Sequence, residues 1–146
     1  MQTVLNNCNL IDGTGAAPMS GARIVLDGQR IVEVGQSSGD HRSYDGARVI
    51  DLSGKTVMPG FFDMHVHSTS HVLDVPSKPG ERPQVAEWLE DPDHLIYTRA
   101  IGNMQRALRA GVTSVRDCGG PRAITIWLKQ VINQGLLPGP RMYVAG

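Results

Sequence analysis

The first third of the chain alternates short apolar segments with clusters of Gly, Asp and Ser, a pattern typical of β-strands joined by turns. Strands are predicted at Thr3–Leu5, Ala22–Leu26, Arg30–Val34 and Arg48–Leu52. Asp27-Gly28 lies between two of these segments, and Asp-Gly favours the tight turns that join antiparallel strands. We therefore expect a hairpin within a small antiparallel sheet, forming a β-rich subdomain over residues 1–57.

The pattern then changes to strands that alternate with helices over residues 58–146. Apolar residues recur at helical spacing between Tyr97 and Leu108, with Asp91 as the predicted N-cap, Pro92 at the first helical position and Gly111 after the end. A second amphipathic helix is predicted from the spacing of Ile124, Trp127, Leu128, Val131 and Ile132, ending at Gly135.

Three strands are expected around these helices, one in the Met58–His67 segment, one at Val112–Asp117 and one at Met142–Ala145. The order strand, helix, strand, helix, strand predicts parallel βαβ units, an α/β architecture with helices covering the sheet. Residues Ser68 to Glu90 hold several prolines without a clear period and are predicted to form a long loop.

The segment from Met58 to His67 carries the main chemical signal. His65 and His67 are two residues apart in a predicted buried strand, so their side chains should share one face. Buried imidazoles are costly to desolvate unless something coordinates them, and neutral imidazole is a preferred zinc ligand. Asp63 lies on the same face and is positioned to orient an imidazole. A purely structural His pair is the alternative.

Other candidate residues lie at the predicted ends of later strands. Arg116 and Asp117 end the second strand of the α/β part, where they would form either an ion pair or a contact with substrate. His71, four residues after His67, is a weaker candidate ligand. Cys8 and Cys118 are far apart and form no CxxC motif, so both are expected to be reduced thiols.

Composition narrows the class of protein. The 146 residues include 40% hydrophobic residues and have a formal net charge of zero, values typical of an ordinary globular protein. No basic excess indicates nucleic-acid binding, and no apolar run approaches the roughly 18 residues of a membrane span. A cytoplasmic location is therefore expected, with neither nucleic acid nor membrane as a partner.

The Met58–His67 segment resembles the PGFxDxHxH signature of the amidohydrolase superfamily of metal-dependent hydrolases. It matches at every fixed position, which are Pro59, Gly60, Phe61, Asp63, His65 and His67. The segments 111–120 and 135–141 are similar to those of the imidazolonepropionase-like and prolidase-like branch, so the resemblance covers essentially the whole chain.

This resemblance implies a fold of which only part is present. The chain would hold the first three strands and two helices of a (β/α)₈ TIM barrel, preceded by part of a composite β-sandwich. Such a barrel needs about 250 residues, so we expect an amino-terminal fragment.

The resemblance also implies an activity. His65 and His67 would bind a divalent metal, expected to be zinc as one or two ions, and metal-activated water would cleave an amide, cyclic amide or dipeptide-type carbon–nitrogen bond. Asp63, Arg116 and Asp117 would support the ligands or contact a small-molecule substrate, with the general base beyond residue 146 and a homo-oligomer possible. The alternatives are a non-catalytic structural or assembly domain and a deaminase of the same superfamily.

Overall fold

The computed structural model describes residues 1–37, 44–70 and 91–145. The chain divides into two compact units, Met1–Pro59 and Gly60–Gly146. Most of the predicted loop after Ser68, including His71, lies outside the described residues.

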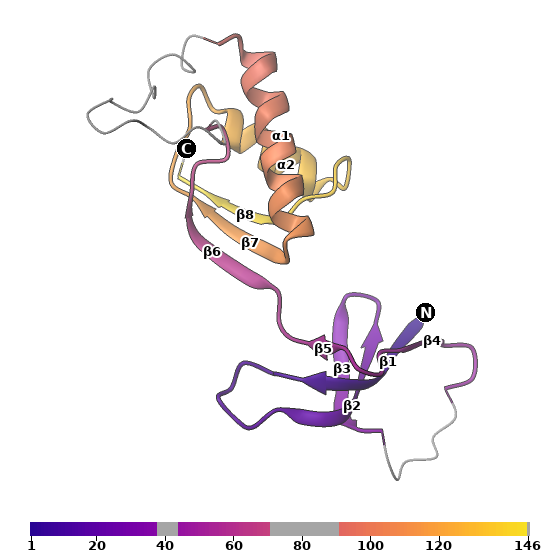
Figure 1. Ribbon diagram of the computed structural model, residues 1–146. Helices are drawn as coiled ribbons and strands as arrows, with labels where there is room; N and C mark the ends of the chain where they lie inside the picture. The colour runs from indigo at the N-terminus through magenta and orange to yellow at the C-terminus, as the bar shows by residue number, and fades with distance from the viewer. Residues whose placement is uncertain (38–43, 71–90, 146) are drawn as a thin grey trace. The chain divides into compact units, whose positions relative to one another are not determined.

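The first unit contains a single five-stranded sheet (Figure 1). Its strands are β1 (Gln2–Leu10), β2 (Met19–Asp27), β3 (Arg30–Gln36), β4 (Arg48–Asp51) and β5 (Thr56–Val57). The predicted hairpin between β2 and β3 is confirmed, with Asp27 opposite Arg30 and Gly28 at a φ of 57° in the turn.

The prediction of a purely antiparallel sheet is wrong, because two strands run parallel to β1. The strand order is β3-β2-β1-β4, and β5 also pairs with β1. β4 occupies one part of the free side of β1 and β5 occupies another, at Asn9 and Leu10. The chain therefore returns twice to the same side of β1 in the same direction, which gives a mixed sheet.

Strand β1 is also longer than predicted because its second half is rich in asparagine. Asn7 has a φ of 61° within an irregular part of the β1–β2 ladder. Its side-chain amide donates a hydrogen bond of 3.1 Å to Asp51 at the end of β4. Hydrogen bonds from the Ser53 side chain and from Asn7 lower the pKa of the Asp51 carboxyl below its ordinary value. These polar contacts continue the strand where the apolar pattern stops.

The second unit contains a three-stranded parallel sheet in the order β6-β7-β8. Its strands are β6 (Phe61–Val66), β7 (Val112–Asp117) and β8 (Arg141–Val144), joined through α1 (Asp93–Arg109) and α2 (Ile124–Asn133). The predicted parallel βαβ arrangement is confirmed, and α1 and α2 lie together beside the sheet (Figure 1).

One hydrophobic core joins the two helices to the sheet. Its buried members are Ile96, Ala100 and Met104 of α1, Ile124 and Leu128 of α2, Val115 of β7 and Met142 of β8. The neighbouring register pair Arg116 and Tyr143 is exposed instead. Because side chains alternate along a strand, the helices cover the face that carries Val115 and Met142, and Arg116 and Tyr143 are exposed on the other face.

The helix ends differ from prediction at one position. Pro92, not Asp91, is the N-cap of α1, because the Asp91 carboxylate forms an ion pair with Arg99 instead of capping the helix. Gly111 follows the C-cap of α1, and Gly135 follows the C-cap of α2, as predicted. Both cysteines are free, as expected. Neither helix of the described part of the chain is long and apolar enough to cross a membrane.

Gly102 in the interior of α1 gives a simple test of this unit. A methyl group added there would meet no atom within 4 Å. Because glycine in a helix interior costs roughly 0.5–1 kcal/mol relative to alanine, Gly102→Ala should raise the free energy of unfolding by about that amount. Urea denaturation measures the change, and a lower free energy of unfolding would show that this part of α1 is packed more tightly than the structure indicates.

Candidate metal centre

His65 and His67 lie at the carboxyl end of β6, His65 inside the strand and His67 immediately after it. Their ring centroids are 5.4 Å apart and the ring planes meet at 66°, an edge-to-face arrangement. The two imidazoles therefore lie side by side, as the alternation of a strand predicts.

The expectation that this strand is buried is wrong for the described residues. Phe61 through His65 are all exposed, as is His67. β6 is an edge strand of the sheet, and the hydrophobic core draws on only one of its residues, Val66. The cost of desolvation therefore gives no support for a metal here, whereas the geometry of the two rings does.

One ring nitrogen of His67 already has a hydrogen-bond partner. Its Nδ1 lies 2.8 Å from the main-chain oxygen of Gly119, in the segment after β7. A carbonyl oxygen only accepts hydrogen bonds, so Nδ1 carries a hydrogen, and in the neutral imidazole the lone pair then lies on Nε2. Metal-binding histidines typically have this arrangement, because a hydrogen bond to a carbonyl or carboxylate fixes the tautomer and aims the other nitrogen at the ion.

Asp63 supports the main chain of β6. Its Oδ1 accepts a hydrogen bond of 3.1 Å from the main-chain N–H of His65, whereas an imidazole was the predicted partner. The β6–β7 ladder shifts register between Asp63 and Val66. The Asp63 carboxylate therefore stabilises an irregular piece of strand from which His65 projects.

Arg116 and Asp117 do not form the ion pair that was one of their two predicted roles. Adjacent residues of a strand point to opposite faces, so Arg116 is exposed while Asp117 is completely buried. Arg116 Nε donates a hydrogen bond of 2.6 Å to the main-chain oxygen of Met64. This contact joins the exposed end of β7 to β6.

The buried carboxylate of Asp117 connects the segments that follow β6 and β7. Its Oδ2 accepts from the main-chain N–H of Ser68 at 3.2 Å, and its Oδ1 accepts from the N–H of Gly119 at 3.1 Å. Gly119 has a φ of 127°, a conformation that other residues rarely adopt, and this places its N–H on Asp117 while its carbonyl holds His67.

An open hollow of about 400 Å³ lies at the carboxyl ends of β7 and β8. Its lining consists of Arg116, Asp117, Cys118, Tyr143, Val144 and Ala145. This volume falls within the range of roughly 300–1,000 Å³ that is usual for small-molecule pockets.

The sequence model described as the amidohydrolase family matches residues 56–146, well over half of the chain. The chain belongs to the amidohydrolase family.

Three similar proteins illustrate the range of the amidohydrolase relatives. An imidazolonepropionase of Streptomyces griseus is 39% identical over 128 residues, covering 80% of this chain and 32% of the relative. An adenine deaminase of Clostridium acetobutylicum is 37% identical over 70 residues, 48% of this chain and 11% of the relative. A prolidase crystallised with N-methylphosphonate-L-proline has a TM-score of 0.81 and 33% identity, covering all of this chain and 32% of that one. The chain thus spans about a third or less of their lengths.

The donor set of this amidohydrolase chain fits part of a divalent-metal site. Two imidazoles side by side, one of them with Nδ1 bound to a carbonyl, are suitable ligands for zinc and related ions. Within the described residues, no group of three or more His, Cys, Asp or Glu side chains is placed to hold a metal. Catalytic zinc usually has three protein ligands, so a site here would need at least one ligand besides these two imidazoles.

Sequence reasoning missed two parts of this site. The Gly119 carbonyl is a main-chain atom, and main-chain acceptors leave no mark in the residue pattern. Tyr143 was treated only as part of a strand, although its place next to Arg116 in the parallel register puts it on the lining of the hollow.

Proposed function

We propose that this chain carries the first two ligands of a divalent-metal site in an amidohydrolase that cleaves a carbon–nitrogen bond, with zinc as the expected ion. The observation that supports the proposal is the His67 hydrogen bond to the Gly119 carbonyl, beside the ring of His65. It commits Nδ1 of an exposed ring to the carbonyl and leaves Nε2 as the nitrogen available to a metal ion.

A bound zinc-type ion would supply a Lewis acid that polarises the scissile carbonyl and lowers the pKa of water. The chain's own residues would orient and bind. Asp63 and Asp117 hold the main chain around the two histidines. Arg116 and Tyr143 line the hollow next to this strand end, where they would contact a small polar substrate. The general base and the remaining ligands are not assigned to any described residue.

We also propose that β6, β7 and β8 are the first three strands of a (β/α)₈ barrel. Their parallel order, the two connecting helices on one face and the likeness to the prolidase structure support this. In such barrels the active site lies at the carboxyl ends of the strands, where His65, His67 and the hollow are found. The five-stranded sheet of the first unit would belong to the composite β-sandwich.

A chelation experiment on the purified product of the complete reading frame tests the proposal. We expect the protein to contain zinc or another divalent ion, to lose hydrolysis of amide or Xaa-Pro dipeptide substrates after chelation, and to regain it when Zn²⁺ is added back. Metal content is measured by plasma mass spectrometry. Full activity in the metal-free protein would contradict the metal role.

Deamination is the second candidate, because an adenine deaminase is among the relatives. Ammonia release separates the two reactions, since hydrolysis of an Xaa-Pro dipeptide frees two amino acids and no ammonia, whereas deamination of adenine frees ammonia. A protein with neither activity and without bound metal would instead support the non-catalytic alternative.

A further inference from the structure

The turn that follows His67 is buried although it is entirely polar. Ser68 and Thr69 are 1% and 0% exposed. The turn closes on His67 itself, because the N–H of Ser70 donates a hydrogen bond of 3.0 Å to the His67 carbonyl. Buried main-chain groups need partners, so whatever binds the turn also determines where the His67 main chain lies.

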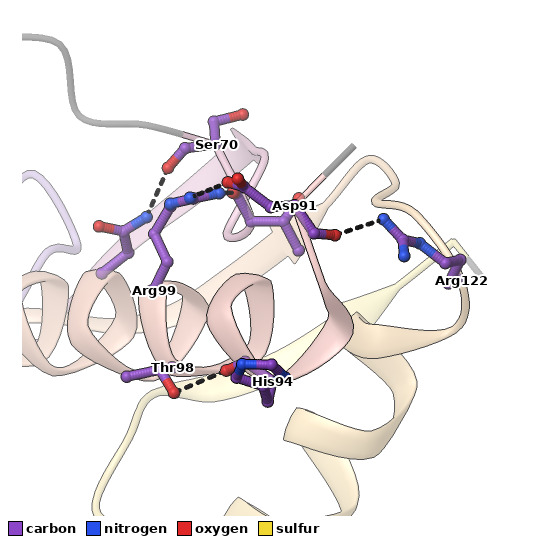
Figure 2. Close-up of polar contacts among 8 residues, drawn as sticks. Ser70, Asp91, His94, Thr98, Arg99 and Arg122 are labelled. Atoms are coloured by element: carbon purple, nitrogen blue, oxygen red, sulfur yellow. Dashed lines mark hydrogen bonds and ion pairs between the residues drawn. The ribbon is translucent and has the colours of Figure 1, made fainter. Parts of the chain in front are cut away.

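Helix α1 supplies those partners from two side chains. Asn103 Nδ2 donates to the carbonyl of Ser68 and to the carbonyl of Ser70, each at 2.8 Å. Arg99 Nη1 donates to the carbonyl of Thr69 at 3.4 Å, and Figure 2 shows Arg99 reaching from α1 to its ion-pair partner Asp91. Three consecutive carbonyls of the turn are thus bound by one face of α1.

The side-chain amide of Asn103 is well suited to bind two carbonyl groups at once. Two carbonyl oxygens need two donors, and the amide group of one asparagine provides both hydrogens from a single nitrogen. The remaining oxygen, Oδ1, accepts from Arg106 Nη1 at 3.1 Å, so the whole side-chain amide is in use. A carboxylate of the same size would instead face two carbonyl oxygens with no proton to offer.

The turn and the His67 ring are therefore fixed from opposite sides. Asn103 holds the carbonyls of Ser68 and Ser70, while Asp117 holds the N–H of Ser68 and, through Gly119, presents the carbonyl that binds His67 Nδ1. If the turn moved, the distance from Nδ1 to that carbonyl would change.

We propose that Asn103 is a positioning residue for the metal ligand His67, acting through the Ser68–Ser70 turn. The inference rests on the proposed function, since it assigns Asn103 a part in the same metal site. Loss of a group that hydrogen-bonds a metal ligand directly typically weakens metal affinity by about 10–100-fold. Asn103 acts on His67 through the turn that follows it, and a loss within this range is expected.

The test uses two variants and one control in the product of the complete reading frame. Asn103→Asp keeps the size of the side chain and removes both donors, and Asn103→Ala removes the group without adding charge. Arg109→Ala changes an exposed residue in the last turn of the same helix. Zn²⁺ affinity is measured by competition with a chromophoric chelator, well below the melting temperature of each variant.

A second readout does not depend on the metal. In metal-free protein, the ¹⁵N chemical shifts of the His67 ring report its tautomer. The wild type and Arg109→Ala should show the Nδ1–H form, and both Asn103 variants should show a mixture. A purely structural role of Asn103 would lower the melting temperature without changing this ratio.

The possible outcomes separate this inference from the proposed function. Affinity lowered about 10–100-fold in both Asn103 variants, with a mixed tautomer, supports the positioning role. Wild-type affinity in both variants overturns it and leaves the metal site standing. Absence of Zn²⁺ binding in the wild type overturns the proposed function itself. If neither variant folds, Asn103 serves the fold and the inference is wrong.

Discussion

Replacing His65 or His67 with alanine is expected to abolish both metal retention and hydrolysis in the product of the complete reading frame. Each substitution removes one of the two imidazoles that lie 5.4 Å apart, centroid to centroid, at the end of β6. Because catalytic zinc usually has only three protein ligands, losing one leaves too few bonds to hold the ion. Metal content after gel filtration and turnover of an Xaa-Pro dipeptide measure the two effects.

His94→Ala is the matched control for these variants. His94 is an exposed histidine at the start of α1, where its main-chain oxygen accepts a hydrogen bond from the Thr98 hydroxyl. Its side chain should be dispensable, so this variant should keep wild-type metal content and activity. Normal metal content in both His65→Ala and His67→Ala would refute the assignment of the ligands.

Gly60→Ala is expected to cause the largest loss of stability among the substitutions considered. A Cβ at this position would lie 2.2 Å from both Cγ2 and Oγ1 of Thr113 and 2.7 Å from its Cβ. Rotation of the Thr113 side chain moves the first two atoms but not the third. The entry to β6 must therefore move away from β7, and overpacking of this kind costs typically 1–3 kcal/mol, so we expect a loss of about 3 kcal/mol.

A second substitution makes this steric explanation testable. Thr113→Gly alone should lower the free energy of unfolding by roughly 1 kcal/mol, because glycine weakens a strand. In the Gly60→Ala background, the same change removes the three atoms nearest to the new methyl group and should raise the free energy of unfolding. Denaturant titration of the four proteins gives the coupling. Additive losses would show that the cost at position 60 has another origin.

The sequence predicted best those elements whose ends are marked by glycine. β7 has the predicted bounds, Val112–Asp117, because Gly111 and Gly119 stand on either side of an apolar strand pattern. β1 extends five residues beyond its predicted end at Leu5, since Asn6, Asn7 and Asn9 continue it with polar side chains. β5 has only two residues, too few to show a period.

The candidate site was predictable only where a side chain carries the chemistry. The spacing of His65 and His67 was enough to predict that their rings lie side by side. The Gly119 carbonyl left no trace in the sequence, because every residue has one. Asn103 lies in an amphipathic helix, where a polar residue is expected to face solvent, so nothing in the pattern indicates that it binds the turn after β6.

The placement of Gly119 has a consequence for anyone who wishes to redesign this protein. Gly119 donates its N–H to Asp117 and accepts a hydrogen bond from His67 with its oxygen. The segments that follow β6 and β7 are therefore held together by this one residue. Grafting a longer loop between β7 and α2 to alter selectivity would also move the Gly119 carbonyl and so change the orientation of the His67 ring. Libraries that diversify this region should keep Asp117 and Gly119 constant and vary the residues beyond them.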